Sequence, residues 1–553
     1  MARPARPARP AHLVLRNARI HTVDPACPEA QAMAVVDGRI AWLGSDEDAP
    51  GWMGPDTQVI DAEGKLVLPG FVDAHNHVRL GSDDACVQLS GATTLHEVHA
   101  RIRTWHTAHP DAEWIEAEAF DYSAVPDGRM PTAADLDPAT GDVPAFVLSY
   151  DVHTAWVNTA GLRALGIDRD HTHLPFGAAV TDPVTGEPTG FIKDFAVKGL
   201  SRDGHRALQR LGLPWASADR QYGRLAKSLD DAIRFGITTV VEPQNSLDDL
   251  QLFDRARAEG RLKSRIVAAL FHPRGTTDAD LDDFATAAHR YDDDRIRVGP
   301  LKLYIDDVVE PRTAALLEPY AGCGRHRGDT FYPPEEFAEL LTKLDARGFQ
   351  CFVHATGDRG IRTVLDAVER ARTVNGERDA RHQVVHVECL DPDDTPRFAA
   401  LGVVACMQPR HCAPEVAGPG KDWAENIGAE RWHKAWPMRS LHNAGAVLAL
   451  SSDWNVAEMD PMVGIHTAVT RRPLGGGEPW MPEETISVET AVHGYTMGSA
   501  YANFLECERG SLTVGKAADF VVLSRDILRA APQDIPGTVA ETVVVAGVVE
   551  HTA

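Results

Sequence analysis

The sequence contains no long hydrophobic run. No stretch approaches the ~20 consecutive apolar residues that a membrane-spanning helix needs, so we expect no membrane anchor. The opening segment MARPARPARPAH is basic and rich in proline, and no apolar segment follows it. It therefore lacks the hydrophobic core of a signal peptide, and we expect residues 1–11 to form a flexible tail.

Positive charge is also scarce. The 553 residues include 55 Lys and Arg against 80 Asp and Glu, which makes a formal net charge of −25. Such a protein repels phosphate backbones and acidic lipids, which argues against nucleic acids and membranes as partners. The eight cysteines are scattered and include no C-x-x-C pair. We expect them to be reduced thiols in a cytoplasmic protein.

Both ends of the chain are predicted to be rich in strands. The segments HLVLRNARIHTV, AMAVVDGRIAWLG and TQVIDAEGKLVLPG alternate apolar and polar residues, and Asp37-Gly38 is typical of a hairpin turn. The C-terminal segments GSLTVGKAADFVVLS and TVAETVVVAGVVEHTA have the same pattern. We predict one β-sandwich domain assembled from residues 12–69 and 505–553. Two separate β caps are the alternative.

The middle of the chain alternates apolar strands with amphipathic helices. This pattern predicts an α/β fold, a (β/α)8 barrel, over residues 70–504. A long excursion at about 82–230 carries helices and strands of its own, so we predict an inserted subdomain there. After His354, GDRGIRTVLDAVERAR predicts a helix with Asp358 as its N-cap. The predicted barrel strands are 71–77, 237–243, 265–271, 297–305, 350–355, 383–388, 403–408 and 446–453.

Candidate metal ligands lie where these barrel strands end. A barrel of this kind carries its active site at the carboxyl ends of its strands. Two histidines separated by one residue on the first strand would point to the same face. Four neutral imidazoles, a carboxylate and a lysine that meet there indicate a site for zinc or a similar borderline ion. These residues are His75, His77, Lys302, His354, His386 and Asp453.

Each of these residues has a simpler explanation when it is taken alone. A histidine after an apolar run can be a hydrogen-bonded structural residue, and Asp453 could cap the turn that follows it. Lys302 lies between Leu301 and Leu303, where a lysine is rarely buried without a partner, although its end could reach solvent. Five strand ends that carry such residues together argue against coincidence and favour the metal site.

Several motifs resemble the signature strands of the amidohydrolase superfamily. They are PGFVDAHNH, GPLKLYIDD, VHATGDRG, RHQVVHVE and LALSSDWN. Further segments, among them DVHTAWVNTAGLRALGI, GEPTGFIKD and GSLTVGKAADFVVL, are similar to the branch that contains N-substituted formamide deformylase. The similar motifs keep their order from about residue 12 to 525.

The resemblance implies a centre of one or two divalent ions, with Zn²⁺ favoured. His75 and His77 would hold the more buried ion, and His354 and His386 the more exposed one. Lys302 would bridge them as a carbamate formed with CO₂, because an ammonium cannot bind a cation whereas a carbamate offers two oxygens. Asp453 would lie beside a bridging hydroxide, since two ions about 3.5–4 Å apart can share and acidify one water.

The implied reaction is hydrolysis of a C–N bond in a small linear amide, such as an N-substituted formamide or an N-acyl amine. A metal-activated hydroxide would attack the carbonyl, and Asp453 would act as general base and then as general acid, with His386 as the second candidate. The same centre could hydrolyse a cyclic amide, imide or lactone, or deaminate a heterocycle. A non-catalytic scaffold is the competing class, but it would be expected to have lost ligands.

Substrate contacts are marked less clearly. His153 in DVHTAWVN matches a histidine of the branch that would reach the substrate, with a structural role in the insertion as the alternative. Gln408, Arg410 and His411 follow the seventh strand and are candidates for the rim. Aromatic side chains that could line a pocket for the amide substituent, or else lie in the core, are Trp114, Tyr122, Trp423 and Trp454.

Two departures from the pattern of the branch lie near the predicted barrel mouth. Asp306 is followed by Asp307, where many relatives have glycine, and VVEPQNS stands where relatives often carry a His-Asp pair. Neither change touches a predicted ligand, but both weaken the case for a deformylase substrate. The expected partner is a small-molecule amide. A homodimer is compatible with the sequence, which leaves the oligomeric state open.

Overall fold

A sheet of eight strands forms the centre of the molecule. The structure, a computed structural model, describes residues 9–81, 83–126 and 129–553. The eight strands are parallel and follow one another in chain order around the sheet, which confirms the predicted (β/α)8 barrel. They are β8 (Phe71–Asp73), β16 (Ile237–Asn245), β17 (Arg265–Phe271), β18 (Ile296–Tyr304), β19 (Cys351–Ala355), β20 (Gln383–His386), β21 (Val404–Met407) and β22 (Leu448–Leu450).

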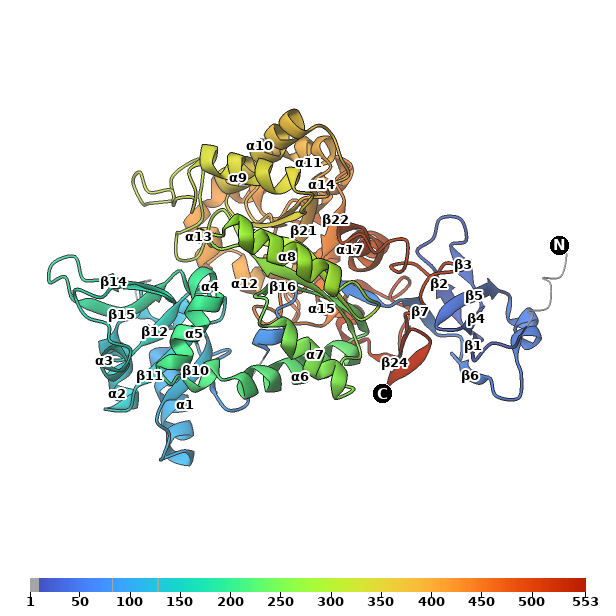
Figure 1. Ribbon diagram of the computed structural model, residues 1–553, viewed down its shortest axis with the longest axis horizontal. Coiled ribbons are helices and arrows are strands. Elements are labelled where there is room, and N and C mark those ends of the chain that lie inside the picture. The colour runs from blue at the N-terminus through green and yellow to red at the C-terminus, as the bar shows by residue number, and fades with distance from the viewer. Residues whose placement is uncertain (1–8, 82, 127–128) are drawn as a thin grey trace.

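Helices follow the strands and cover the outside of the barrel (Figure 1). Their apolar faces pack on the strands in one large core, as the amphipathic patterns predict. The main ones are α6 (Ala218–Arg234), α7 (Leu250–Ala258), α8 (Asp278–Arg290), α9 (Pro334–Ala346), α10 (Asp358–Asn375), α11 (Thr395–Leu401), α14 (Met438–Asn443) and α15 (Pro461–Thr470).

The start of α10 differs from the prediction. The N-cap position is Gly357, and Asp358 is the first helical residue. The carboxylate that accepts the N–H groups of Gly357 and Thr356, at 2.9 and 3.0 Å, belongs to Asp306, which follows the neighbouring strand β18. Asp358 instead accepts from Lys434 and from the N–H of Leu317. The cap therefore comes from a neighbouring strand, which no local pattern reveals.

The first and last barrel strands are joined by a side chain. The carboxylate of Asp73 accepts the N–H of Ser452 at 3.0 Å and its hydroxyl at 2.6 Å. It also accepts the side-chain amide of Asn76 at 2.9 Å. A backbone bond from Asp453 N–H to the His75 carbonyl, at 2.8 Å, continues the junction. These contacts hold the loops after β8 and β22 side by side, where candidate ligands lie.

The insertion folds around a sheet of its own. Seven strands in the order β13-β14-β15-β12-β11-β10-β9 form it, and helices α1 (Leu95–Ala108), α2 (Ala133–Thr140) and α3 (Thr159–Ala164) pack beside it. It lies to one side of the barrel in Figure 1. The predicted boundary at residue 230 falls within α6, whose Leu225, Leu229 and Ile233 pack in the barrel core. The strands are β9 (Val87–Gln88), β10 (Ile115–Phe120), β11 (Ala145–Ser149), β12 (Ala155–Val157), β13 (His173–Leu174), β14 (Gly177–Thr181) and β15 (Pro188–Lys193).

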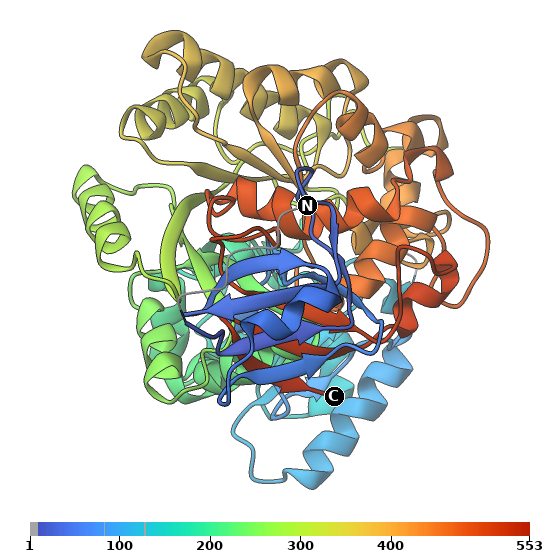
Figure 2. The same ribbon diagram turned by 90° about the vertical axis from the view of Figure 1, so that its right-hand side faces the viewer.

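Strands from both ends of the chain form two further sheets, which share one core (Figure 2). One has the order β5-β4-β1-β6 and the other β25-β24-β23-β7-β2-β3, in which β7 pairs antiparallel with the C-terminal β23. The hairpin at Asp37-Gly38 has positive φ at both residues, as its sequence predicts. The strands are β1 (Leu13–Arg16), β2 (Arg19–His21), β3 (Glu29–Ala30), β4 (Ala32–Val36), β5 (Arg39–Gly44), β6 (Gln58–Asp61), β7 (Leu66–Pro69), β23 (Phe520–Leu523), β24 (Ala540–Val545) and β25 (Val548–Thr552).

Two further expectations concern the N-terminal tail and membrane-spanning helices. Residues 1–8 of the expected N-terminal tail lie outside the described residues, whereas Ala11 is buried and its N–H donates to the carbonyl of Trp52. Within the described ranges, no helix has the length and apolar character needed to cross a lipid bilayer.

A buried ion pair joins the barrel to the terminal sheets. Arg265 in β17 makes two hydrogen bonds of 2.9 Å to the carboxylate of Asp519, which precedes β23, and both side chains are almost fully buried. Arg265 also pairs with the more exposed Asp294. Burial alone would raise the pKa of Asp519, but Arg265 outweighs it and holds that pKa below its usual range. The pair therefore stabilises the fold above the ordinary carboxyl pKa, and its contribution is lost as the pH falls through the lowered value.

We expect Asp519→Ala to lower the free energy of unfolding by about 3 kcal/mol, because it leaves Arg265 buried with only Asp294 as a partner. Urea unfolding at pH 7 measures this loss. Asp534→Ala, at an exposed carboxylate of the same region, should change the free energy by less than about 0.5 kcal/mol. Equal stability of the two variants would show that the pair does not hold the barrel and the terminal sheets together.

Candidate metal centre

Two histidines of the candidate site lie in the loop after the first barrel strand. Strand β8 ends at Asp73, so His75 and His77 are not strand residues, and alternation along a strand is not what brings them together. The loop is held by Asn76 N–H, which donates to the carbonyl of Val241 at 2.9 Å. The two Nε2 atoms lie 3.2 Å apart. Loop geometry therefore produces the convergence that we had predicted from strand geometry.

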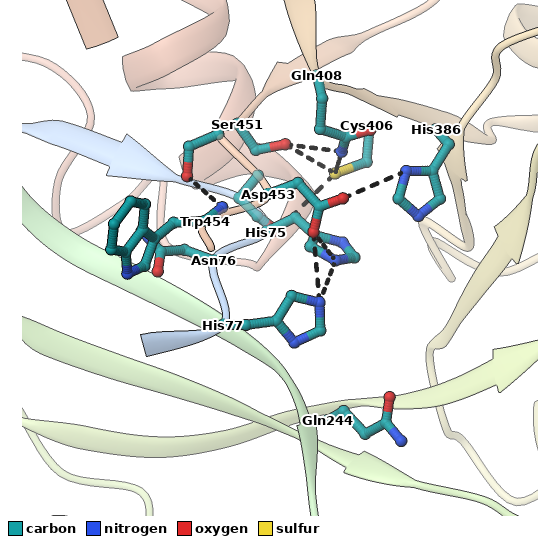
Figure 3. Close-up of polar contacts among 12 residues, drawn as sticks. His75, Asn76, His77, Gln244, His386, Cys406, Gln408, Ser451, Asp453 and Trp454 are labelled. Atoms are coloured by element: carbon teal, nitrogen blue, oxygen red, sulfur yellow. Dashed lines mark hydrogen bonds and ion pairs between the residues drawn. The ribbon is translucent and has the colours of Figure 1, made fainter. Parts of the chain in front are cut away.

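The carboxylate of Asp453 lies against these histidines (Figure 3). Its Oδ1 is 3.1 Å from His75 Nε2 and 3.3 Å from His77 Nε2. Its Oδ2 is 3.8 Å from His386 Nδ1. Asp453 and His386 both have φ in the left-handed region, at 57° and 81°. Such backbone is costly for a residue with a side chain, and it is retained mainly where a side chain must be aimed precisely.

The charges of this cluster follow from its burial. Burial lowers the pKa of His75 to about 3 and the pKa values of His354 and His386 well below the usual range. These imidazoles are therefore neutral and offer lone pairs. Burial opposes the charge of Asp453, but the surrounding imidazoles outweigh it and hold its pKa well below the usual carboxyl range. The cluster thus combines neutral nitrogen ligands with one carboxylate.

The donor set fits a divalent cation such as zinc. Neutral imidazole and carboxylate are ligands of Zn²⁺ and related borderline ions. Ligand atoms of His75, His386 and Asp453 lie within 4.8 Å of one another. Among the described residues, the buried atoms without a hydrogen-bond partner include Nδ1 of His386 and Oδ1 of Asp453. Buried polar atoms normally have partners, so atoms left without one at a shared focus are consistent with a bound ion.

Lys302 and His354 lie beside this cluster and face the same cavity. The Lys302 ammonium nitrogen is 4.7 Å from the centre of the Tyr304 ring and 5.2 Å from that of Phe352. Burial lowers the pKa of Lys302 to about 8. The His354 ring lies 4.4 Å from that of His386, but its Nε2 is 3.2 Å from the carbonyl oxygen of Asp307. The structure therefore places both residues at the site while giving one nitrogen of His354 another partner.

A cavity of about 470 Å³ lies above the cluster, between the barrel mouth and the insertion. The insertion contributes Tyr122 and His153, and the loop after β22 contributes Trp454. A smaller hollow of about 210 Å³ shares part of this lining, including Trp454 and Tyr150. The cavity is large enough for a drug-sized molecule.

His153 is bound to the barrel by one of its nitrogens. Its Nδ1 forms a short ion pair with Asp307, one of the two departures noted in the sequence. Burial opposes the charge on His153, but Asp307 outweighs it and raises the pKa of His153 to about 9. The ring lies 5.3 Å from that of His354. The insertion thus brings a cationic hydrogen-bond donor to the edge of the candidate metal centre.

Three residues expected to contact substrate do not line the cavity. Trp114 is buried in the core of the insertion, and Trp423 is buried beside Trp436 and Trp480. Gln408 is fully buried and donates to Ser451. None of these three side chains reaches the cavity, because the direction of a side chain depends on packing between segments, which the local sequence does not show. Tyr122, Arg410, His411 and Trp454 do line the cavity.

The sequence analysis did not single out two carboxylates of the site. Glu388 lies two residues after His386, and its Oε2 accepts a hydrogen bond of 3.0 Å from Trp423. Glu242 is fully buried, 3.9 Å from His77 Nδ1, and accepts from Arg79 at 2.7 Å. The sequence could have indicated both residues, because a glutamate at the end of an apolar barrel strand needs a partner when it is buried.

The fold and the site together define a class: a (β/α)8 barrel with histidines and a carboxylate converging at its mouth, as in metal-dependent hydrolases. The sequence profile described as "Amidohydrolase family" matches residues 58–551. The chain belongs to this family and is a metal-dependent amidohydrolase.

Individual relatives cover most of the chain. It is 30% identical to protein LONG AFTER FAR-RED 3 of Arabidopsis thaliana, over 97% of this chain and 91% of that protein. It is 29% identical to N-substituted formamide deformylase of Arthrobacter pascens, over 93% of each. The fold is similar to that of an uncharacterized metal-dependent hydrolase from Pyrococcus horikoshii, with a TM-score of 0.71 and 22% identity over 94% of this chain and 99% of that one.

We expect His75→Ala to reduce the amount of divalent metal bound, because it removes a nitrogen that faces both His77 and Asp453. Elemental analysis of the protein after equilibration with Zn²⁺ measures this. His96→Ala, at an exposed histidine of the insertion, should bind as much metal as the unaltered chain. Unchanged binding in His75→Ala would exclude this cluster as the metal centre.

Proposed function

We propose that this enzyme hydrolyses the C–N bond of a small linear amide, of the N-substituted formamide or N-acyl amine type, to a carboxylic acid and an amine. The observation that carries the proposal is the position of Asp453, a buried carboxylate among histidines beneath a cavity of about 470 Å³. The relationship to N-substituted formamide deformylase supports this substrate class.

The proposed cofactor is one or two Zn²⁺ ions. His75, His77 and Asp453 would hold the first, and His354 and His386 would contribute to a second. A bound ion of this kind supplies Lewis acidity, which polarises a carbonyl and brings the pKa of water from 15.7 towards about 7. The remaining steps depend on the side chains of the chain itself.

Asp453 is the proposed proton carrier. Its low pKa keeps it ionised, so it can accept a proton from the attacking water on Oδ1 or Oδ2 and then give it to the nitrogen of the leaving amine. His386 lies 3.8 Å from Oδ2 and is the next candidate for this transfer. His153 points a cationic imidazole from the insertion towards the same cavity, where it can donate to the oxygen of the amide.

The proposed substrate carries an apolar or aromatic substituent. Tyr122 and Trp454 line the cavity, and the Tyr122 hydroxyl is already bonded to Asp151 at 3.1 Å, so the ring rather than the hydroxyl is free for contact. Such a small molecule is the only partner that the proposal requires. The eight cysteines are all free, which supports a reducing compartment, and we propose the cytoplasm.

A panel of amides tests the proposed function. The enzyme loaded with Zn²⁺ should release amine from N-benzylformamide or a related N-acyl amine, and removal of the metal should abolish the release. Asp453→Asn should lower kcat by roughly 10²–10⁴ through loss of the proton carrier. Cyclic imides, lactones and amino-heterocycles belong in the same panel. Turnover of those compounds without turnover of linear amides would overturn the proposed substrate class, and equal rates with and without metal would overturn the mechanism.

Lys302 is the proposed bridge between two ions. With its pKa lowered to about 8, a fraction of the side chain is uncharged amine near neutral pH, and that nitrogen can attack CO₂. An N–C bond forms, one proton leaves the nitrogen, and the product is a carbamate whose two oxygens carry a negative charge. This change would replace a cation that repels metals with a ligand that binds them.

We expect protein supplied with ¹³C-bicarbonate and Zn²⁺ to show a carbamate signal in its ¹³C NMR spectrum. Lys302→Ala should lose the signal and bind less metal, because it removes the amine that reacts with CO₂. Lys193→Ala, at an exposed lysine, should keep both. Acetate at high concentration should partly restore metal binding to Lys302→Ala by occupying the vacated position. An active, metal-loaded enzyme without the signal would refute the carbamate.

A further inference from the structure

A smaller hollow adjoins the cavity above the candidate metal centre and extends into the insertion. Its volume is about 210 Å³, and it shares Leu80, Tyr150 and Trp454 with the larger cavity. Trp454 directly follows Asp453 in the chain, and Leu80 lies three residues after His77. The hollow therefore begins beside the candidate metal centre, where a substituent of a bound substrate can enter it.

The walls of the hollow are mostly apolar. The apolar and aromatic side chains that line it are Leu80, Leu148, Tyr150, Val152, Trp215 and Trp454. A cavity of about 150 Å³ with apolar walls holds a benzene ring. The hollow therefore has room for a short alkyl chain or a benzyl group, which is the size of an amide substituent rather than of a whole substrate.

Glu118 of β10 is the exception in this lining. It is only 6% exposed. Its Oε1 accepts hydrogen bonds from the Asp83 N–H at 2.9 Å and from the Gln88 side-chain amide at 2.7 Å. Its Oε2 has no hydrogen-bond donor among residues 9–81, 83–126 and 129–553. A carboxylate oxygen so far removed from water is costly unless a donor or a cation meets it.

The charges behind the hollow are also unbalanced. Three carboxylates share two guanidinium groups there, namely Asp83, Glu116 and Glu118 beside Arg220 and Arg224. Both arginines pair with Asp83, at 2.6 and 3.0 Å, and Arg220 also pairs with Glu116 at 3.1 Å. Glu118 forms no ion pair in the part of the chain that the structure describes. Burial raises its pKa, and its hydrogen bonds and Arg224 offset this only in part. A cation in the hollow would balance the third carboxylate.

The larger cavity has the same sign of charge. Asp121, Glu310 and Asp422 line it, and none of them forms an ion pair within the described ranges. Lys421 lines it too, whereas Arg410 is already paired with two glutamates. Carboxylates outnumber cationic groups in this lining, so the field in the cavity favours cationic ligands over anionic ones.

An organic ammonium suits the hollow better than a metal ion does. Divalent cations need several oxygen or nitrogen ligands, whereas Glu118 offers one free oxygen among apolar walls. An ammonium needs one good acceptor, and its carbon chain gains from contact with apolar side chains. The rings of Tyr150 and Trp454 add faces that attract organic cations.

We propose that this hollow is a subsite for the substituent on the amide nitrogen, and that Glu118 selects a substituent that ends in a protonated amine. The inference rests on the proposed function and names its substrate class, the mono-N-acyl diamines. Hydrolysis adds one water across the C–N bond of such an amide and releases a carboxylic acid and a diamine. Glu118 is a specificity-determining residue in this proposal and takes no part in the proton transfers.

Two amides of equal length test the subsite. N-hexylformamide has a methyl group where N-formylcadaverine has its ammonium. The Zn²⁺-loaded enzyme should act on N-formylcadaverine with a kcat/KM roughly 10–100-fold higher. Glu118→Gln should bring the two values together, chiefly by raising the KM for N-formylcadaverine, because the residue does not touch the reacting atoms. Glu113→Gln, at an exposed glutamate of the insertion, should keep the preference. Equal values in the unaltered enzyme, or an undiminished preference in Glu118→Gln, would overturn the inference.

Binding measured without turnover separates this inference from the proposed function. In calorimetric titrations, n-pentylammonium should bind the Zn²⁺-loaded enzyme roughly 10–100-fold more tightly than n-pentanol, and Glu118→Gln should lose most of this difference. That result without hydrolysis of any linear amide would overturn the proposed function and support the ammonium subsite. Hydrolysis of both formamides at equal rates, with no preference for n-pentylammonium, would overturn the subsite and leave the proposed function in place.

Discussion

The carboxylate of Asp453 is buried within 3.3 Å of two imidazoles and within 3.8 Å of two more. A buried charge of this kind is stable only where donors or cations surround it. The segments that carry these side chains, at the ends of β8, β20, β21 and β22, must therefore keep fixed positions relative to one another. Asp453 and His386 both have left-handed backbone, so keeping these positions carries a local cost in conformational energy.

The closure of the barrel and the geometry of the site depend on the same contacts. Asp73 joins the first strand to the loop after the last one by accepting from Ser452, the residue before Asp453. The N–H of Asp453 then donates to the carbonyl of His75. Because the two ligand loops meet only where the sheet closes, any slip between β8 and β22 would separate His75 from Asp453. Fold stability and ligand geometry are therefore not independent here.

The insertion completes the site from the other side. His153 and Asp307 lie 154 residues apart in the chain, and their ion pair ties the insertion to the barrel next to His354. Tyr122 and Tyr150 extend the same wall of the cavity. A barrel shared by many enzymes supplies the ligands, whereas the insertion shapes the space that a substrate would occupy.

The sequence by itself determined the eight strands, their order and the residues at their ends, because apolar periodicity and the position of polar residues are local properties of the chain. It predicted that His75, Lys302, His354, His386 and Asp453 would meet, since parallel strands of a barrel end at one face. Only the tertiary structure decided how they meet. It placed His75 and His77 in a loop, joined His153 to Asp307, turned Trp114 into the core and brought Glu388 and His411 to Asp453. Each of these outcomes depends on packing between segments distant in the chain, and local patterns carry no information about such contacts.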